Sequence, residues 1–503
     1  EDIYYRFNDI QYRWVSKENW NYSRTFDVPE DIVQKKEIFL VFYGVDTIAS
    51  VFLNDQHIGD TENMFVRYAF SIKSLIKAGS NNLEVQIQSP IIVAQEKYDI
   101  QAKQYLVPPN CPPNESQGEC HINFLRKMQA SFSWDWGPAF PSVGIWKSVA
   151  IEAFDTAILR EVIIQTVESK VDWILTVNIF LETGSQVSNI SGNFTATLTL
   201  DSNSITVTKD DNTILPHAPG IFNTTLVLEI PKTQVELWWP NGYGNQKLYP
   251  LEVLFSNNGT DISTKALKIG FRSVELVQEP LDTGTGLTFY FKVNNVPVFA
   301  KGSNWIPSHV LPEKSAEPAR LEHLLESAKL ANMNMLRVWG GGLYESDLFY
   351  QLADEKGILI WQDFMFACSM YPTDQDFLQS VSTEITQQVR RLQHHPSIAI
   401  WAGNNENEAA LRGNWYGTSS DFGHYKEDYI KLYVDTIRKV TMSQETVRPF
   451  VVSSPSNGLE SETEDYIAQN PFDSHYGDLH FYLYILNGWN PNIFINTRFC
   501  SEY

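Results

Sequence analysis

Two glutamates follow a short apolar stretch late in the chain, and their type and spacing suit acid–base chemistry. The segment IWAGNNENEAAL (400–411) breaks from apolar residues into asparagine and glutamate. Glu406 stands where a predicted strand has just ended, beside Asn405, whereas Glu408 falls where the chain turns into a helix or loop. Because acidic residues collect in first helical turns, we expect Glu408 to be a capping or supporting acid and Glu406 to carry the chemistry.

The second carboxylate that such chemistry requires is Glu502, at the end of the last predicted strand. Cleavage of a glycosidic bond uses one carboxyl group to protonate the leaving oxygen and another to attack or to activate water. On the fourth and seventh strands of a parallel barrel the two groups would lie about 5–5.5 Å apart, the spacing that gives retention of configuration. We therefore predict that Glu502 is the nucleophile and Glu406 the general acid/base.

Other polar and aromatic residues also gather at predicted strand ends, where the loops of a β/α barrel build an active site. They are Asn304, Trp305, Arg337, Trp339, Asp363, His480 and Tyr482. Packing alone would favour valine, isoleucine and leucine there. We expect Arg337 to keep Glu502 ionised through its charge and count it among the residues around the substrate, whereas Asp363 can be purely structural.

These side chains need a barrel to position them. Helical periodicity covers residues 319–333, 345–356 and 376–394, and short apolar strands lie between the helices. The strands are VPVFAKGSNW, MNMLRVWGGG, GILIWQDFMF, SIAIWAGNNE, RPFVVSSPS, GDLHFY and NTRFCSEY. Seven such strands predict a TIM (β/α)8 barrel over residues 278–503, truncated after strand 7.

Two β-sandwich domains are expected before the barrel. Residues 1–152 contain short alternating strands, such as KEIFLVFYGVDTIASVFLNDQHIGD and NNLEVQIQSP, which predict a jelly-roll-like, sugar-binding type of sandwich. Residues 153–277 are richer in threonine and valine, as in WILTVNIFLETG and GNFTATLTLDS. Their length and pattern predict an immunoglobulin-like sandwich.

Composition excludes some partners. The 503 residues carry a formal charge of -22, which argues against a nucleic-acid backbone as partner. No apolar run of membrane-spanning length occurs. Six N-glycosylation sequons lie before residue 260, at Asn21, Asn114, Asn189, Asn193, Asn223 and Asn258. The polar loop between Cys111 and Cys120 suits either a small disulfide in a secreted or lysosomal protein or two loop thiols, and we expect the disulfide. Cys368 and Cys500 lie in apolar segments and are expected to be simply buried.

Three longer motifs carry a family resemblance. They are SWDWGPAFPSVGIWKSV (133–149), RVWGGGLYESDLFYQLADEKGILIWQDFMFACSMYP (337–372) and HHPSIAIWAGNNENE (394–408). With the order sandwich, sandwich, barrel, the whole chain resembles the β-mannosidases of glycoside hydrolase family 2, in particular the animal lysosomal members. The resemblance implies an exo-acting enzyme that releases terminal non-reducing β-D-mannose from oligosaccharides during N-glycan breakdown.

The resemblance also implies roles for single residues. Asp135, with Trp134 beside it, would bind hydroxyls of the terminal sugar, and Trp339 would line the same pocket. Asn405 would bind the 2-hydroxyl, and Tyr482 would donate a hydrogen bond to the nucleophile. No cofactor or metal is expected, because protonation and covalent attack suffice.

The chain departs from this family in one respect. Family members begin earlier and continue past the nucleophile with strand 8 and further β-domains. We therefore expect the 503 residues to be a fragment or processed product, a monomer that needs the missing C-terminal portion to complete its barrel. Two other functions stay open: another family 2 exo-glycosidase, such as a β-glucosaminidase or β-galactosidase, and a carbohydrate-binding protein on a decayed barrel.

Overall fold

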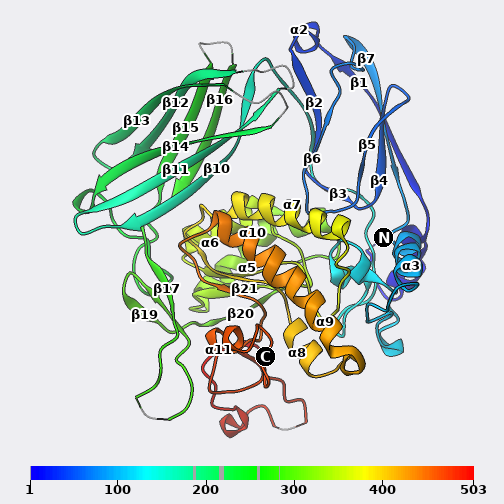
Figure 1. Cartoon of the computed structure of the whole chain (residues 1–503), viewed down its shortest axis with the longest axis vertical. Coiled ribbons are helices and arrows are strands. Elements are labelled where there is room, and N and C mark those ends of the chain that lie inside the picture. The colour runs from blue at the N-terminus through cyan, green and yellow to red at the C-terminus, as the bar shows by residue number, and fades with distance from the viewer. Residues whose placement is uncertain (1, 185–188, 215–219, 258–260, 283, 486) are drawn as a thin grey trace.

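Two β-sandwiches and a set of parallel β/α strands make up the molecule, as predicted (Figure 1). The computed structural model describes residues 2–184, 189–214, 220–257, 261–282, 284–485 and 487–503. The sandwiches lie side by side on the same side of the β/α region, and helix α7 runs beneath them. Among the described residues, no helix combines the length and apolar character needed to cross a bilayer.

Alternating apolar residues build the first sandwich from two antiparallel sheets, ordered β1–β7–β4–β5 and β6–β2–β9. The strands are β1 (Trp20–Val28), β2 (Glu37–Phe42), β4 (Ala49–Leu53), β5 (Gln56–Thr61), β6 (Tyr68–Ser71), β7 (Gly79–Ile87) and β9 (Val149–Phe154). A short pair, β3 (Val45–Asp46) and β8 (Gly144–Ile145), and the short helices α1 (Asn8–Gln11) and α2 (Glu30–Val33) complete it. Leu40, Phe42, Val51 and Val85 belong to the core between the sheets.

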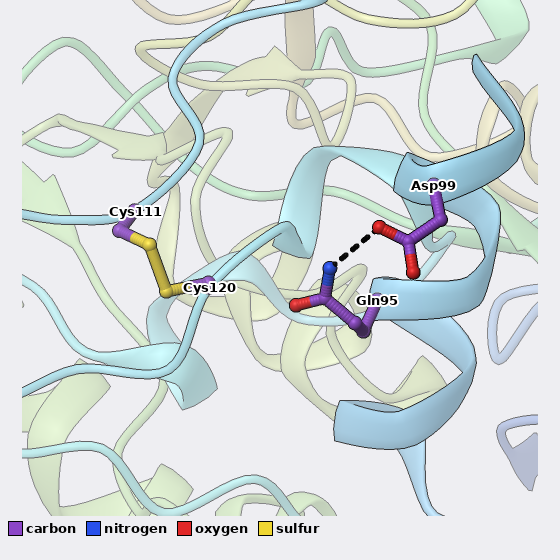
Figure 2. The surroundings of a disulfide bond; sticks show 4 residues. All are labelled: Gln95, Asp99, Cys111 and Cys120. Atoms are coloured by element: carbon purple, nitrogen blue, oxygen red, sulfur yellow. Dashed lines mark hydrogen bonds between the residues drawn. A yellow bond between two sulfur atoms is a disulfide. The ribbon is translucent and has the colours of Figure 1, made fainter. Parts of the chain in front are cut away.

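The segment between β7 and β8 leaves the sandwich and runs toward the β/α region. It begins with helix α3 (Pro90–Gln101), whose first turn is capped by the Ser89 hydroxyl. A loop follows in which Cys111 and Cys120 form a disulfide beside α3 (Figure 2). Val93 of α3 packs with Leu125 and Phe132 of the same segment, which positions the Trp134–Pro138 turn.

The second sandwich pairs the sheet β10–β11–β14 with the sheet β13–β12–β15–β16. Its strands are β10 (Ala157–Glu168), β11 (Asp172–Thr183), β12 (Asn189–Thr199), β13 (Ser204–Ile214), β14 (Ile221–Pro231), β15 (Tyr249–Asn257) and β16 (Asp261–Ile269). Every second residue of β11 is buried, the period expected of a strand with one face on a core.

A small antiparallel sheet corrects the predicted first barrel strand. It contains β17 (Val274–Val277), β18 (Tyr290–Val293) and β19 (Val296–Val298). The predicted strand VPVFAKGSNW is therefore two strands, β19 and the barrel strand β20 (Gly302–Trp305). Asn294 and Asn295 have φ of 51° and 64°, the backbone of a two-residue hairpin turn, so β19 folds back on β18.

Seven parallel strands follow, five in the sheet β20–β21–β22–β23–β24 and two in the pair β25–β26. They are β21 (Met335–Val338), β22 (Leu359–Asp363), β23 (Ile398–Ala402), β24 (Phe450–Val451), β25 (Leu479–His480) and β26 (Cys500–Glu502), after β20. The predicted helices are α5 (Pro318–Leu330), α6 (Asp347–Lys356) and α7 (Gln375–Leu392). The other helices are α4 (Pro312–Ser315), α8 (Asn407–Arg412), α9 (Phe422–Tyr429), the π-helix η7 (Ile430–Arg438), α10 (Lys439–Gln444) and α11 (Leu459–Thr463).

Helix α7 of the β/α region forms side-chain bonds with both sandwiches. Its Glu384 accepts hydrogen bonds from Arg126 (2.7 and 2.9 Å) and Asn63 (2.9 Å), both from the first sandwich unit. At its other end Arg390 donates to Glu161 of the second sandwich at 3.0 Å. The sandwiches are therefore held in a defined position relative to the strand ends of the barrel.

Candidate active site

The two predicted catalytic glutamates come together at the carboxyl ends of their strands. Glu406 lies just after β23 and Glu502 ends β26. One oxygen of each carboxylate and Nδ1 of His480 all lie within 4.8 Å of one another. This close approach fits the shorter of the two carboxylate spacings found in glycosidases, about 5–5.5 Å, which is the retaining one.

The environment of Glu502 favours its ionised form. Arg337 Nη1 donates to Glu502 Oε2 at 2.6 Å, and the Tyr482 hydroxyl donates to Glu502 Oε1. Burial raises the pKa of Glu502, but the charge of Arg337, the nearby His480 and the Tyr482 hydrogen bond outweigh burial and leave this pKa below its usual value. An ionised carboxylate is what a nucleophile needs.

The guanidinium of Arg337 bonds to residues at the ends of four strands. Besides Glu502, its guanidinium donates to Asp363 Oδ2 and Asn405 Oδ1, both at 2.7 Å, and to Asn304 Oδ1 at 2.9 Å. The side chain is buried, with 3% of its surface exposed. Arg337 therefore orients Glu502, and Asp363 serves Arg337 as a buried counter-ion.

Glu406 has a different set of neighbours. His480 Nδ1 lies 2.7 Å from Glu406 Oε1, and the Cys368 thiol donates to Oε2 at 3.1 Å. Burial, followed by the charge of Glu406, raises the pKa of Cys368 well above its usual range, so the thiol keeps the proton that it donates. Glu406 itself has φ of 65°, a left-handed backbone that costs about 1–2 kcal/mol in a non-glycine residue and turns its side chain out of the strand.

Asn405 is held between two of these groups. Its Oδ1 accepts from Arg337, its Nδ2 donates to Cys368 Sγ at 3.4 Å, and only 1% of the residue is exposed. The expected contact between Asn405 and a sugar hydroxyl therefore requires an incoming hydroxyl to share the amide with these partners.

The Trp134–Pro138 turn of the first sandwich unit reaches the barrel loop that follows β21. Ala130 N donates to Gly341 O at 2.9 Å. The ring centroids of Trp134 and Trp136 lie 4.6 and 5.6 Å from that of Trp339. Asp135 is exposed between these tryptophans. Two segments about 200 residues apart thus build one aromatic wall.

Within this wall, Trp136 rather than Trp339 presents a free ring. Trp339 is 3% exposed because the other two tryptophans pack on it, whereas Trp136 is 53% exposed. Trp339, expected to line the sugar pocket, thus has most of its ring covered by Trp134 and Trp136. Trp136 stands in the same motif. Its place in a turn, where side chains are often exposed, was the signal that could have identified it as the free ring of this wall.

Glu408, expected to be a capping or supporting acid, has structural partners. It lies in the first turn of α8 and is fully buried, where its Oε1 accepts from Ser461 Oγ at 2.9 Å and from Ala468 N at 2.8 Å. Burial raises the pKa of Glu408 to about 8. It is a protonated structural acid over most of the physiological range.

Three residues of the site were not predicted from the sequence. Cys368 was expected to be merely buried, yet its thiol contacts Glu406 because Ala367 and Asn405 pair as neighbouring parallel strands. Ser454 and Asp478 orient His480: its Nε2 lies 3.2 Å from Ser454 Oγ, which donates to Asp478 at 2.7 Å. Ser454 follows β24 and Asp478 precedes β25. These positions next to strands were the signal from which a role in the site could have been predicted.

The remaining predicted residues lie away from this centre. His395 pairs with Asp354 at 2.5 Å, in keeping with a structural role. Trp305 donates to Glu345 at 3.0 Å. The sequon asparagines 21, 114, 193 and 223 are exposed, nothing is described of the Asn189 side chain, and Asn258 lies outside the described residues.

Two β-sandwich domains ahead of parallel barrel strands, with paired glutamates at the strand ends, define the class of multidomain glycosidase-type β/α-barrel proteins. The family model "Glycosyl hydrolase 2 galactose-binding domain-like" matches residues 1–147, and "Glycosyl hydrolases family 2" matches residues 156–272. The chain belongs to glycosyl hydrolase family 2.

Its relatives are similar over the whole chain. A protein named beta-mannosidase from Capra hircus is 46% identical over 100% of this chain and 56% of its own length. A probable beta-mannosidase from Caenorhabditis elegans is 37% identical over 99% and 55%. The crystal structure of a beta-D-mannosidase from Dictyoglomus thermophilum superimposes with a TM-score of 0.87 at 34% identity, over 100% of this chain and 58% of that one. The chain thus spans about half the length of the curated relatives that it matches.

Proposed function

We propose that the chain carries the catalytic centre of a retaining exo-β-mannosidase, with Glu502 as nucleophile and Glu406 as general acid/base. The observation that carries the proposal is the pair of carboxylates brought within 4.8 Å of His480 and of each other at two strand ends. The similarity over the whole chain to proteins named beta-mannosidase supports mannose as the sugar.

The reaction would proceed by two displacements. Glu502 attacks the anomeric carbon while the protonated Glu406 gives its proton to the departing glycosidic oxygen, which leaves a mannosyl ester on Glu502. Glu406, now a carboxylate, takes a proton from water as the water oxygen attacks the same carbon and Glu502 leaves. Arg337 and Tyr482 stabilise the charge of Glu502 before attack and after release.

Sugar-binding roles extend the proposal. Asp135 and Trp134 in the turn from the first sandwich would bind the outer side of the terminal mannose, with Trp339 supporting them from below. Asn405 would bind the 2-hydroxyl from its place beside Arg337. Removal of single terminal residues, rather than cleavage within a chain, belongs to the proposal because the chain is similar over its whole length to proteins named beta-mannosidase.

Architecture and location complete the proposal. We divide the chain into domains at residues 1–152, 153–277 and 278–503 and propose that an eighth strand completes the barrel between β26 and β20. In this structure β20 and β26 contact each other directly, through bonds from Asn304 to Ser501 O at 3.1 Å and from Tyr503 to Gly302 O at 2.9 Å, so these bonds would have to break to admit that strand. We place the protein in the lysosome as a monomer acting on N-glycan fragments. The lowered pKa of Glu502 would keep this carboxylate ionised in an acidic compartment.

The competing functions are less well supported. A β-glucuronidase and an exo-chitosanase share the fold at 16% and 17% identity, with TM-scores of 0.64 and 0.66, and this likeness concerns the fold alone. A binding protein on a decayed barrel would not need to retain both glutamates together with their hydrogen-bonding partners Arg337, Tyr482 and His480.

A mechanism-based label tests the proposal. The protein, with its barrel completed by the continuation found in its relatives, is incubated with 2-deoxy-2-fluoro-β-D-mannosyl fluoride, digested, and weighed by peptide mass spectrometry. One fluoromannosyl group on the peptide containing Glu502 is expected. A label on another residue would refute the assignment, and a folded, unlabelled protein that reacts instead with the matching glucosyl or galactosyl reagent would refute mannose.

A further inference from the structure

We propose that Glu406, Glu502 and His480 form a binding site for one divalent transition-metal ion of the Zn²⁺ type. His480 Nδ1 lies 2.7 Å from Glu406 Oε1 and 3.6 Å from Glu502 Oε2. Zinc holds imidazole nitrogen and carboxylate oxygen at about 2.0–2.2 Å in a tetrahedron, which places neighbouring donor atoms about 3.3 Å apart. The two separations from His480 lie on either side of this value, and the two carboxylate oxygens lie within 4.8 Å of each other, so side-chain rotations can bring the three donors onto one ion.

His480 is held in the orientation that a metal ligand needs. Its ring is almost fully buried, with 1% of the side chain exposed. Nδ1 faces both carboxylates, while Nε2 lies against the Ser454 hydroxyl, which in turn donates to Asp478. A histidine whose second nitrogen is fixed by a hydrogen-bonded neighbour is the usual arrangement behind a metal ion.

The charge of the centre also suits a dication. Three carboxylates lie at this centre with one guanidinium: Glu502 and Asp363 contact Arg337, and Glu406 contacts His480. With all of them ionised, two formal negative charges remain without compensation. The mixed nitrogen and oxygen donors select Zn²⁺ or Cu²⁺ over Mg²⁺ and Ca²⁺, which prefer oxygen alone.

An ion at this place would stop catalysis. It would take the lone pair with which Glu502 attacks and the oxygen on which Glu406 carries its proton. Inhibition therefore rests on the proposed function, whereas binding of the ion does not. The centre would bind either the ion or the sugar, and inhibition would be competitive with substrate.

Calorimetric titration with ZnCl₂ tests binding without any turnover. One ion per chain is expected for the unaltered protein, and Glu406→Gln, Glu502→Gln and His480→Asn should each weaken it by at least about tenfold. His475→Ala is the matched control, because it removes an exposed imidazole that is also paired with a carboxylate, Asp473. Circular dichroism establishes that each variant is folded, and any one folded ligand variant suffices.

The outcomes separate the two proposals. Zn²⁺ affinity that is unchanged in the folded ligand variants, or that is lost in His475→Ala, would overturn the metal site, as would failure of the unaltered protein to bind at 1 mM, roughly the weakest metal affinities that proteins use. Binding by a protein that fails the fluoromannosyl label would leave the metal site standing and refute the function. Labelling that proceeds unchanged in the presence of Zn²⁺ would leave the function standing and refute the metal site.

Discussion

At the scale of residues, the two glutamates differ because their neighbours differ. Glu502 lies against a guanidinium and a phenol, and Glu406 lies against an imidazole and a protonated thiol. A cation beside a carboxylate favours its charged form, and of the two glutamates only Glu502 contacts a guanidinium in the described structure. The proposed division into nucleophile and acid follows from this asymmetry.

Tyr482→Phe should move the acid limb of the pH–rate profile. The Tyr482 hydroxyl helps to lower the pKa of Glu502, so its loss raises that pKa and protonates the nucleophile at a higher pH. Hydrogen bonds to charged groups contribute roughly 1.5–3 kcal/mol, so we expect the limb of kcat/KM to shift upward by about one pH unit. Tyr484→Phe, whose ring stacks on Tyr482 and is 83% exposed, should leave the limb unmoved. An unshifted limb in Tyr482→Phe would contradict this assignment.

Glu408 should make stability fall as the pH rises. Its pKa is raised to about 8 in the folded protein and is about 4.3 in an unfolded chain. Between these values the unfolded chain has lost the proton that the folded one keeps, so rising pH favours unfolding, by on the order of 5 kcal/mol across the window. Glu408→Gln keeps the shape without the proton, so its melting temperature should fall less between pH 5 and pH 8. If the melting temperatures of the two proteins fall equally between pH 5 and pH 8, a protonated Glu408 is refuted.

At the scale of elements, α7 is the structural link between sandwiches and barrel. Its Glu384 is 0% exposed and pairs with Arg126, which is 3% exposed. The Tyr344 hydroxyl donates to the same carboxylate at 2.7 Å. A buried pair of this kind adds little over apolar packing, but removing one member leaves an unpaired buried charge.

Glu384→Ala should therefore destabilise the protein by about 3–5 kcal/mol. Urea unfolding, followed by tryptophan fluorescence and by circular dichroism, measures the loss. Gln379→Ala, at an exposed position of the same helix, is the control and should change stability by less than about 0.5 kcal/mol. Equal effects of the two changes would show that the Glu384 pair does not hold the units together.

Elements with a clear period were predictable, and very short ones were not. Residues 319–333, 345–356 and 376–394 were expected to be helical, and α5, α6 and α7 occupy 318–330, 347–356 and 375–392. The apolar segment VPVF carried no period that distinguishes a barrel strand from a hairpin strand. The pair Asn294–Asn295 before it, suited to φ above zero, was the deciding signal.

At the scale of the whole molecule, the proposed pocket is shared between the first sandwich unit and the barrel. Trp136→Ala removes the exposed ring of the wall while leaving the buried Trp134–Trp339 contact. Loss of apolar surface at a sugar should raise KM by an order of magnitude with a smaller effect on kcat. Steady-state kinetics on an aryl β-mannoside measures both. Trp14→Ala, at another half-exposed tryptophan of the same unit, should change neither; an unaltered KM in Trp136→Ala would place the sugar elsewhere.

Contacts between distant segments set the limit of prediction from sequence. Strand ends could be chosen one by one, because polar groups there break the apolar pattern, and Glu406, Glu502, Arg337 and Tyr482 were found in this way. The contact of Cys368 with Glu406 depends on the register of two parallel strands, β22 and β23, beyond their last ladder pairs. No local pattern encodes such a register.

The contact between Arg337 and Glu502 spans 165 residues of chain, and this sets an order of assembly during synthesis. Arg337 can form its bonds to Asn304, Asp363 and Asn405 as soon as residue 405 has left the ribosome, whereas the nucleophile is made nearly a hundred residues later. Non-local pairings of this length close late and slowly. Under the proposed mechanism, every folding intermediate in which β26 has not yet docked is chemically silent.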